Sequence, residues 1–220
     1  MRVLVACEES QAVCKAFREL GHEAFSCDII ECSGGHPEWH IQGDVLKQLD
    51  KGWDLMIAHP PCTFMSKAGA RWMFPTAGNL DKARYEKALK AKEFFMKLLN
   101  ADIPLIAVEN PFPLKVVKLP EPTQTIQPYE YGHKYSKKTL LWLKGLPKLE
   151  PTDIIKEHET YLPSNTGGKK RGQKFSRGIS KNAKESSKTF SGIAKAMAEQ
   201  WSEFALHESK DDNNVKGVSE

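Results

Sequence analysis

The 220-residue sequence predicts an α/β protein built on a single, doubly wound and mostly parallel sheet. Short apolar runs alternate with amphipathic segments along the chain, and two of those runs end directly at proline-containing polar turns. Strands that alternate with helices form parallel sheets with right-handed crossovers, and this length suits one domain. We expect one folded domain over residues 1–206 and a disordered polar tail over residues 207–220.

The first half of the chain supplies the first three expected strands and two helices. Residues 2–6 are a short apolar run, and residues 11–20 repeat apolar positions at helical spacing before Gly21, a natural C-terminal stop. Residues 23–29 form the second strand. A glycine-rich loop then leads to a short helix after Gly43. Residues 53–58 form the next strand, because a run of apolar residues ending at a rigid turn suits a strand covered on both faces.

The second half continues the alternation and then departs from it. Residues 80–100 carry apolar positions among many Lys and Glu residues, as an amphipathic helix does, and strands are expected at residues 103–108 and 139–143. A closing helix is expected over residues 193–206. Between them, residues 163–188 hold eight basic side chains and one acidic one, a local charge of +7, so we expect a flexible basic insertion.

The composition excludes several classes of protein. The chain is 40% hydrophobic and 27% charged with a net charge of +4, and no apolar stretch approaches the roughly 20 residues that span a bilayer. The N-terminus reads as a strand rather than a signal peptide. Five scattered cysteines, an odd number, indicate a reducing compartment rather than a disulfide framework. We therefore expect a cytoplasmic protein with no membrane partner.

The polar residues that follow two of the expected strands indicate chemistry. Cys62 follows two prolines after the strand at residues 53–58, and Glu109 follows the strand at residues 103–108. A residue before proline is restricted to extended conformations, so both strands are expected to stop where the polar residues begin. Ligands of open α/β sheets bind at the carboxyl ends of the strands. A thiol and a carboxylate meeting there predict covalent catalysis assisted by an acid.

These motifs resemble a known family. Pro60-Pro61-Cys62 followed by Ser66 resembles the catalytic loop of DNA cytosine carbon-5 methyltransferases, and Glu109-Asn110-Pro111 resembles their Glu-Asn-Val/Pro motif. The likeness is closest to small phage- and prophage-encoded members, which share the runs Ala-His-Pro-Pro-Cys, Ala-Val-Glu-Asn-Pro, Lys-Lys-Thr-Leu-Leu-Trp-Leu and Thr-Phe-Ser-Gly-Ile-Ala. It covers about residues 1–149 and 188–205.

The resemblance implies a fold, a reaction and a set of site residues. The fold is the Rossmann-like fold of S-adenosylmethionine-dependent methyltransferases, and the substrate is cytosine in DNA, in the bacterial host cytoplasm if the protein is phage-encoded. Cys62 is implied as the nucleophile and Glu109 as the general acid. The implied S-adenosylmethionine contacts are Cys7, Glu8, Glu9, Asp28, Ile29, Asp44, Val45, Pro60 and Ser191. The implied nucleic-acid contacts, by resemblance or by charge, are Ser66, Lys137, Lys138, Lys169, Lys170, Arg171 and Lys174.

The sequence departs from the family pattern in three places. The first loop, residues 6–12, lacks the glycines that let backbone approach the cofactor, so weaker binding is expected. Lysines (Lys134, Lys137 and Lys138) replace an arginine-bearing motif. Only about 40 residues separate Pro151 from the closing helix, which leaves no room for a target-recognition domain. Specificity would then come from short loops or from a protein partner.

Two other functions and one metal site stay open at this point. The same cysteine and glutamate chemistry could act on a free pyrimidine nucleotide, which would explain the missing recognition domain. Alternatively, a catalytically degenerate methyltransferase fold could bind nucleic acid or a protein without turnover, as the missing glycines suggest. Cys27, Cys32, His36 and His40 could be read as zinc ligands, but their spacing matches no common zinc motif, and we expect no metal.

Overall fold

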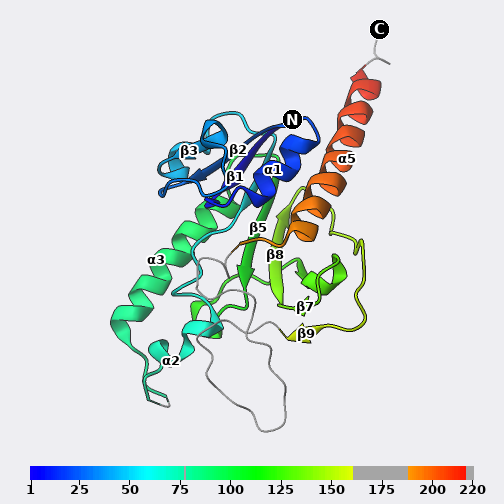
Figure 1. Cartoon of the computed structure of the whole chain (residues 1–220). Coiled ribbons are helices and arrows are strands. Elements are labelled where there is room, and N and C mark those ends of the chain that lie inside the picture. Colours follow the sequence, from blue (N-terminus) through cyan, green and yellow to red (C-terminus); the bar gives the residue numbers. More distant parts are fainter. Residues whose placement is uncertain (77, 161–187, 217–220) are drawn as a thin grey trace.

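A computed structural model of the chain describes residues 1–76, 78–160 and 188–216. One seven-stranded sheet, in the order β3-β2-β1-β4-β5-β8-β6, organises them (Figure 1). Strand β8 pairs antiparallel with both β5 and β6, whereas the other neighbours pair in parallel. This confirms the predicted fold class, a single, doubly wound and mostly parallel sheet. The strands are β1 (Arg2–Ala6), β2 (Glu23–Asp28), β3 (His40–Gln42), β4 (Leu55–Ala58), β5 (Leu105–Pro111), β6 (Gln124–Ile126) and β8 (Thr139–Lys144).

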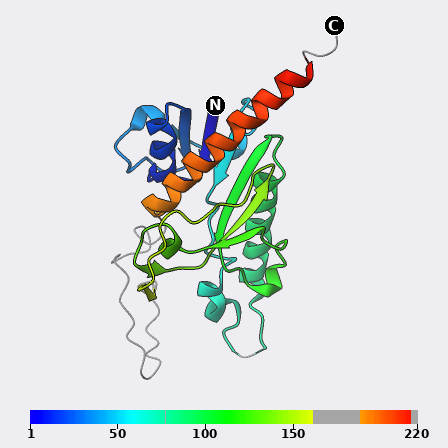
Figure 2. The ribbon, with the colours of Figure 1, turned by 90° about the vertical axis from the view of Figure 1, so that its right-hand side faces the viewer.

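Helices cover both faces of the sheet (Figures 1 and 2). The 18-residue α3 packs on one face, where Phe95 and Leu98 are fully buried against alternate strand residues such as Met56 and Ile106. Helices α1 and α5 pack on the other face. The alternation of side chains along each strand therefore divides the core into two layers. The helices are α1 (Ala12–Glu19), α2 (Ala70–Met73), α3 (Lys82–Leu99) and α5 (Ser191–Lys216).

The register of the two central strands sets the position of the polar turns. Ala58 at the end of β4 pairs with Val108 of β5, so the residues that follow, 59 and 109, lie side by side at the carboxyl edge. The prediction that the strand at residues 103–108 stops at Val108 is wrong. Strand β5 runs on to Pro111 because β8 pairs with its extension, with Glu109 opposite Leu141. The antiparallel partner holds the glutamate on a strand rather than on a loop.

Several elements differ from the sequence prediction or were missed by it. The short edge strands β3 and β6 were not expected, nor was a separate two-stranded parallel pair, β7 (Tyr135–Ser136) with β9 (Glu159–Thr160). Helix α5 continues to Lys216 instead of ending at residue 206, so it includes most of the expected tail. Adding one residue to an existing helix is far easier than starting a new helix. The basic insertion at residues 163–188 lies outside the described residues except for Lys188, and so do residues 217–220.

Among residues 1–76, 78–160 and 188–216, no helix combines the length and the apolar character needed to cross a membrane.

Candidate active site

Cys62 sits in a tight turn at the end of β4. The backbone amides of Met65 and Ser66 both donate to the Cys62 carbonyl, at 3.0 and 2.9 Å, so the chain doubles back directly after the thiol. The side-chain amide of Asn110 donates to the Pro60 carbonyl at 3.4 Å and ties this turn to β5. Because Asn110 is fully buried, the link fixes the position of the diproline turn beside Glu109.

Burial and charge act in opposite directions on the Cys62 thiol. Burial raises its pKa above the usual value, and the Glu109 carboxylate raises it further. The local backbone, the Lys137 ammonium and the Ser66 hydroxyl lower it in part. Ser66 and Lys137, which the sequence suggested as nucleic-acid contacts, are therefore placed to act on the thiol itself. In the free protein the group is a thiol at neutral pH, and Lys137 and Ser66 favour its thiolate.

His59 is a member of this site whose role the sequence analysis missed. Its ring nitrogen Nδ1 lies 3.3 Å from Glu109 Oε2, and its side chain is only 12% exposed. Burial alone would lower the pKa of His59, but the hydrogen bond and charge of Glu109, together with the charge of Glu8, raise it overall. The other ring nitrogen, Nε2, is buried and has no hydrogen-bond partner among the described residues. A histidine directly before the diproline turn was the only signal available in the sequence.

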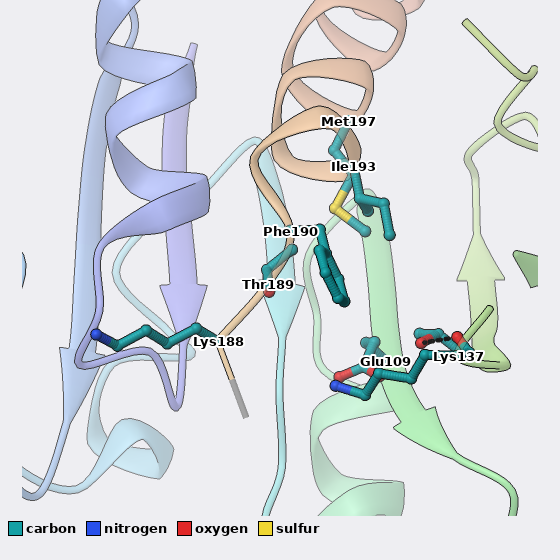
Figure 3. A pocket seen from close by; sticks show the side chains of 8 residues that line it. Glu109, Lys137, Lys188, Thr189, Phe190, Ile193 and Met197 are labelled. Carbon is teal, nitrogen blue, oxygen red and sulfur yellow. Dashed lines mark hydrogen bonds between the residues drawn. The ribbon is translucent and has the colours of Figure 1, made fainter. Parts of the chain in front are cut away.

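Glu109 opens onto a pocket whose empty volume, including its mouth, is about 320 Å³ (Figure 3). The Phe190 ring lies over the space next to Glu109 and Lys137, and the Lys137 Nζ is 5.7 Å from its centroid. His133 stacks obliquely on the same ring, with 5.0 Å between centroids. The pocket thus combines one aromatic wall, a carboxylate and an ammonium group. The lining residues are Glu109, Lys137, Thr139, Lys188, Thr189, Phe190, Ile193 and Met197.

The start of α5 closes one side of this pocket and explains the Thr-Phe-Ser-Gly run. The Gly192 amide donates to His133 Nε2 at 3.0 Å. A Cβ atom at position 192 would collide with the Tyr131 carbonyl oxygen, so only glycine permits this approach. The close contact places Phe190 over the pocket. The exposed Ser191, a predicted cofactor contact, is the first residue of the helix.

The other half of the carboxyl edge brings together three of the predicted cofactor residues. Burial raises the pKa of Cys7 to about 12, and the charges of Asp28 and Asp44 contribute to the shift, which places both carboxylates near the first loop. Each uses Oδ1 to accept a local backbone amide, Ile30 for Asp28 and Leu46 for Asp44. Among the described residues neither Oδ2 atom has a partner, so both can accept from the hydroxyl or amino groups of a nucleoside.

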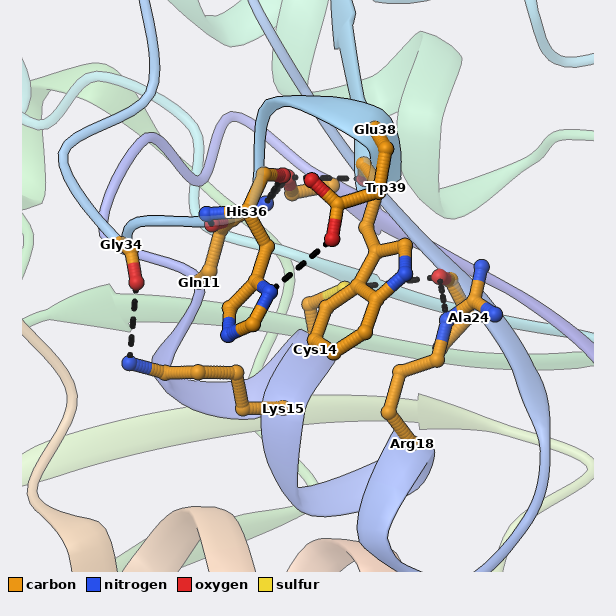
Figure 4. Close-up of polar contacts among 10 residues, drawn as sticks. Gln11, Cys14, Lys15, Arg18, Ala24, Gly34, His36, Glu38 and Trp39 are labelled. Carbon is orange, nitrogen blue, oxygen red and sulfur yellow. Dashed lines mark hydrogen bonds and ion pairs between the residues drawn. The ribbon is translucent and has the colours of Figure 1, made fainter.

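Side-chain hydrogen bonds shape the glycine-poor first loop (Figure 4). Cys7 and Gln11 both have left-handed backbone conformations, with φ of 59° and 58°. Left-handed geometry costs a non-glycine residue about 1–2 kcal/mol. The fully buried Gln11 side chain offsets this, because its amide donates to the His36 carbonyl at 2.8 Å and its Oε1 accepts from the His36 amide at 3.1 Å. The loop therefore keeps turns that usually need glycine.

The remaining predicted contacts fall into two groups. Glu8 is 4% exposed and caps α1 by accepting from Val13 N at 2.7 Å, and Val45 is also 4% exposed within the core. Both side chains face inward, so a cofactor would contact the backbone at these two positions. Glu9, Ile29 and Pro60 remain near the edge, and Lys138 is exposed beside the pocket strand β8. Lys169, Lys170, Arg171 and Lys174 lie outside the described residues.

Three of the four residues that could be read as zinc ligands, Cys27, His36 and His40, have other partners. His40 uses both ring nitrogens, with Ser26 Oγ at 2.9 Å and the Ile30 carbonyl at 2.9 Å, and Cys27 is buried in β2. In the described part of the chain no three metal-binding side chains gather as a metal ion would require.

Comparisons with known proteins give only distant likenesses. No protein-family model matches the sequence, and no curated protein matches it. Among solved structures, a protein described as a DNA modification methyltransferase encoded within a prophage (E. coli) is 15% identical, with a TM-score of 0.45. The methyltransferase EhMeth of Entamoeba histolytica is 12% identical, with a TM-score of 0.44. Each match covers 70% of this chain, which spans 52% and 57% of the two structures. We base the functional proposal on the site itself.

Proposed function

We propose that this protein methylates carbon-5 of cytosine in DNA through a covalent thiolate mechanism, with S-adenosylmethionine as the methyl donor. The observation that carries the proposal is that Cys62, which follows β4, and Glu109, which lies within β5, are both at the carboxyl edge of two adjacent parallel strands. Two links support it, Asn110 to Pro60 and His59 to Glu109. Carbon-5 of cytosine is a poor nucleophile, and a thiol beside a carboxyl group meets that chemical problem directly.

The residues have distinct roles in this mechanism. Lys137 and Ser66 favour the Cys62 thiolate, which forms a bond to carbon-6 of the cytosine ring. The electron pair displaced from the ring develops charge at nitrogen-3, where Glu109 donates a proton. The His59 imidazole is hydrogen-bonded to Glu109 through Nδ1 and holds the carboxyl group in place. The proton between these two side chains is the one that Glu109 passes to nitrogen-3. When carbon-5 later loses its proton to a solvent base, the electron pair of that bond re-forms the ring double bond and expels the Cys62 thiolate, and nitrogen-3 returns its proton to Glu109.

The first three strands offer a site for the cofactor. S-adenosylmethionine supplies the electrophilic methyl group when it is bound. Asp28 and Asp44, each with one free carboxylate oxygen, suit its ribose hydroxyls and adenine amine, and the backbone of the first loop lies between them and Cys62. Ligands bind at this carboxyl edge in doubly wound sheets. The free oxygens are the feature of this chain that fits the group.

The pocket bears on the choice of substrate. Phe190 and Glu109 line the same open pocket, and a base inside a duplex must leave the stack before it can reach such a site. A site that takes one base at a time also suits one alternative, a free pyrimidine nucleotide modified by the same cysteine and glutamate. A protein partner that supplies target recognition fits the DNA hypothesis, because the described loops around Cys62 are short.

Labelled S-adenosylmethionine separates these functions. The protein is incubated with duplex DNA, single-stranded DNA, RNA or dCMP, and the nucleosides are analysed for label on carbon-5 of cytosine. We expect label in DNA and none in a Cys62→Ala sample. Label confined to dCMP would establish the nucleotide alternative. Cofactor binding without label in any substrate would instead support a degenerate fold that binds without turnover.

A further inference from the structure

Both catalytic segments lead into one exposed surface. The chain after Cys62 and the chain after Glu109 run side by side: Lys67 N donates to the Phe112 carbonyl at 2.8 Å, and Leu114 N donates to the Met65 carbonyl at 2.7 Å. Beyond this junction, aromatic rings alternate with cationic side chains. We call this the aromatic–basic surface; its residues are Phe64, Lys67, Arg71, Trp72, Arg84 and Phe112.

Each ring of this surface has a cation against one face. The Arg71 guanidinium lies 3.9 Å from the Trp72 centroid, and Lys67 Nζ lies 4.5 Å from the Phe112 centroid. The Arg84 guanidinium serves two rings, at 5.0 Å from Phe64 and 5.5 Å from Trp72. Each exposed cation–π contact contributes about 0.5–1 kcal/mol. The contacts therefore favour this arrangement of rings and cations before any partner arrives.

Packing alone does not account for the exposure of these rings. Trp72 is 46% exposed and Phe112 is 41% exposed, although Met65 and Met73 of the same segment are fully buried and anchor it to the core. Residues 63–80 contain two basic side chains and no acidic one. A large, exposed aromatic group with an uncompensated positive charge suits a flat, anionic partner. Bases stack on such rings while phosphates pair with the cations.

We infer that the aromatic–basic surface binds unpaired nucleotides next to the target cytosine, so that the preferred substrate is single-stranded DNA. The inference rests on the proposed function and specifies its substrate class. The faces of bases inside a duplex are covered by their neighbours, so ring stacking of this kind is available only to an unpaired strand. The surface adjoins Cys62 and Glu109, and the strand it holds therefore extends from the reacting base.

Binding can be measured without cofactor or turnover. A fluorescent 12-nucleotide strand containing one cytosine, and the same sequence as a duplex, are titrated with the full chain at two salt concentrations. We expect the single strand to bind more tightly. Replacing Trp72 or Phe112 by alanine weakens single-strand binding about ten-fold and leaves the salt dependence unchanged. Arg71→Gln instead lowers the slope of log K against log salt by about 0.7.

Two further variants make the test specific. Leu20→Ala is a matched control, because Leu20 is 45% exposed and follows α1, which packs on the other face of the sheet from α3. This variant should bind the single strand normally. Trp72→Phe keeps a ring and should retain affinity. All five tryptophans are described and Trp72 is the most exposed, so quenching of intrinsic fluorescence by the strand should disappear in Trp72→Phe.

The outcomes separate this inference from the proposed function. Tighter duplex binding, or Trp72→Ala and Phe112→Ala variants that bind the strand normally, would overturn the inference. Carbon-5 methylation of duplex DNA under those conditions would leave the proposed function intact. Single-strand binding that depends on Trp72, without methyl transfer to any cytosine, would support the inferred binding surface and contradict the proposed reaction.

Discussion

The two halves of the carboxyl edge reach rigid geometry by different means. Around Cys62 and Glu109, prolines and strand pairing fix the backbone, and Glu109 and Lys137 line an open pocket. Around the first loop, buried side chains do the fixing, because Gln11 binds the His36 backbone and Glu8 caps α1. A substitution around Cys62 and Glu109 should abolish the reaction and leave the stability of the fold unchanged. A substitution around the first loop should change the loop conformation and weaken ligand binding.

The largest expected effect is at Cys62. Cys62→Ala should have no measurable methyl transfer and form no adduct with DNA that carries 5-fluorocytosine, because it lacks the attacking atom. Intact-protein mass spectrometry detects the adduct, and urea unfolding should show near-normal stability. Cys32→Ala is the control, since Cys32 is another half-buried free thiol. An adduct that maps to any other cysteine contradicts the assignment.

The next effect is the loss of the acid. Glu109→Gln preserves the shape of the side chain but cannot donate a proton to nitrogen-3, so the rate of methyl transfer should fall about 10²- to 10⁴-fold. Single-turnover kinetics measures the chemical step directly. The affinity of this variant for single-stranded DNA should be unchanged. A rate within a factor of three of the natural protein would remove Glu109 from the mechanism.

An intermediate effect tests the first loop. Gln11→Ala leaves the His36 backbone groups without their partner while keeping a side chain at φ 58°, so unfolding free energy should fall by about 1–3 kcal/mol. S-adenosylmethionine binding should weaken in parallel. Gln11→Gly loses the same bonds but tolerates the left-handed geometry, so it should be more stable than the alanine variant by about 1 kcal/mol.

Urea unfolding and calorimetry with the cofactor provide both measurements for the Gln11 variants. Equal stability of the alanine and glycine variants would show that backbone strain at position 11 does not affect the free energy of unfolding. Unchanged cofactor affinity in both variants would separate the loop from the cofactor site and break the comparison between the two halves.

The smallest effect is a shift in thiol titration. The pKa of Cys62 is raised by burial and by Glu109, so the thiolate fraction is small at neutral pH and grows only as the pH approaches that raised pKa. Alkylation of Cys62 should therefore accelerate at a higher pH than for an ordinary thiol. Glu109→Gln should move the midpoint to lower pH by removing a negative charge. Lys137→Met should move it to higher pH.

Peptide mass spectrometry must follow the Cys62 peptide by itself, since burial also raises the pKa of Cys7 and of Cys14 to about 12. Identical midpoints in the two variants would place the charges of Glu109 and Lys137 too far from the thiol to affect it.

Local patterns in the sequence determined most of the regular structure. The strands β1, β2, β4 and β8 and the helices α1 and α3 lie within about two residues of their predicted bounds, because hydrophobic periodicity and glycine or proline boundaries are local signals. Cys62 and Glu109 could be selected for the same reason, since each follows an apolar run that ends at a proline-containing segment. The three-residue β3 and β6 carry too few residues to show a period, and pairing with longer neighbours stabilises them.

Contacts between distant segments decided the rest. The sequence could not reveal that β8 pairs with β5 as far as Pro111, that His59 bonds to Glu109, or that Gln11 replaces glycine by binding the His36 backbone. Nor could it place Phe112 against Lys67, in the segment that carries Trp72. Each of these depends on two residues at least 25 positions apart along the chain. The sequence by itself determined which elements form and which residues carry the chemistry. Only the tertiary structure decided which side chains face each other, because the packing of the whole sheet sets the distances between segments that are far apart in the sequence.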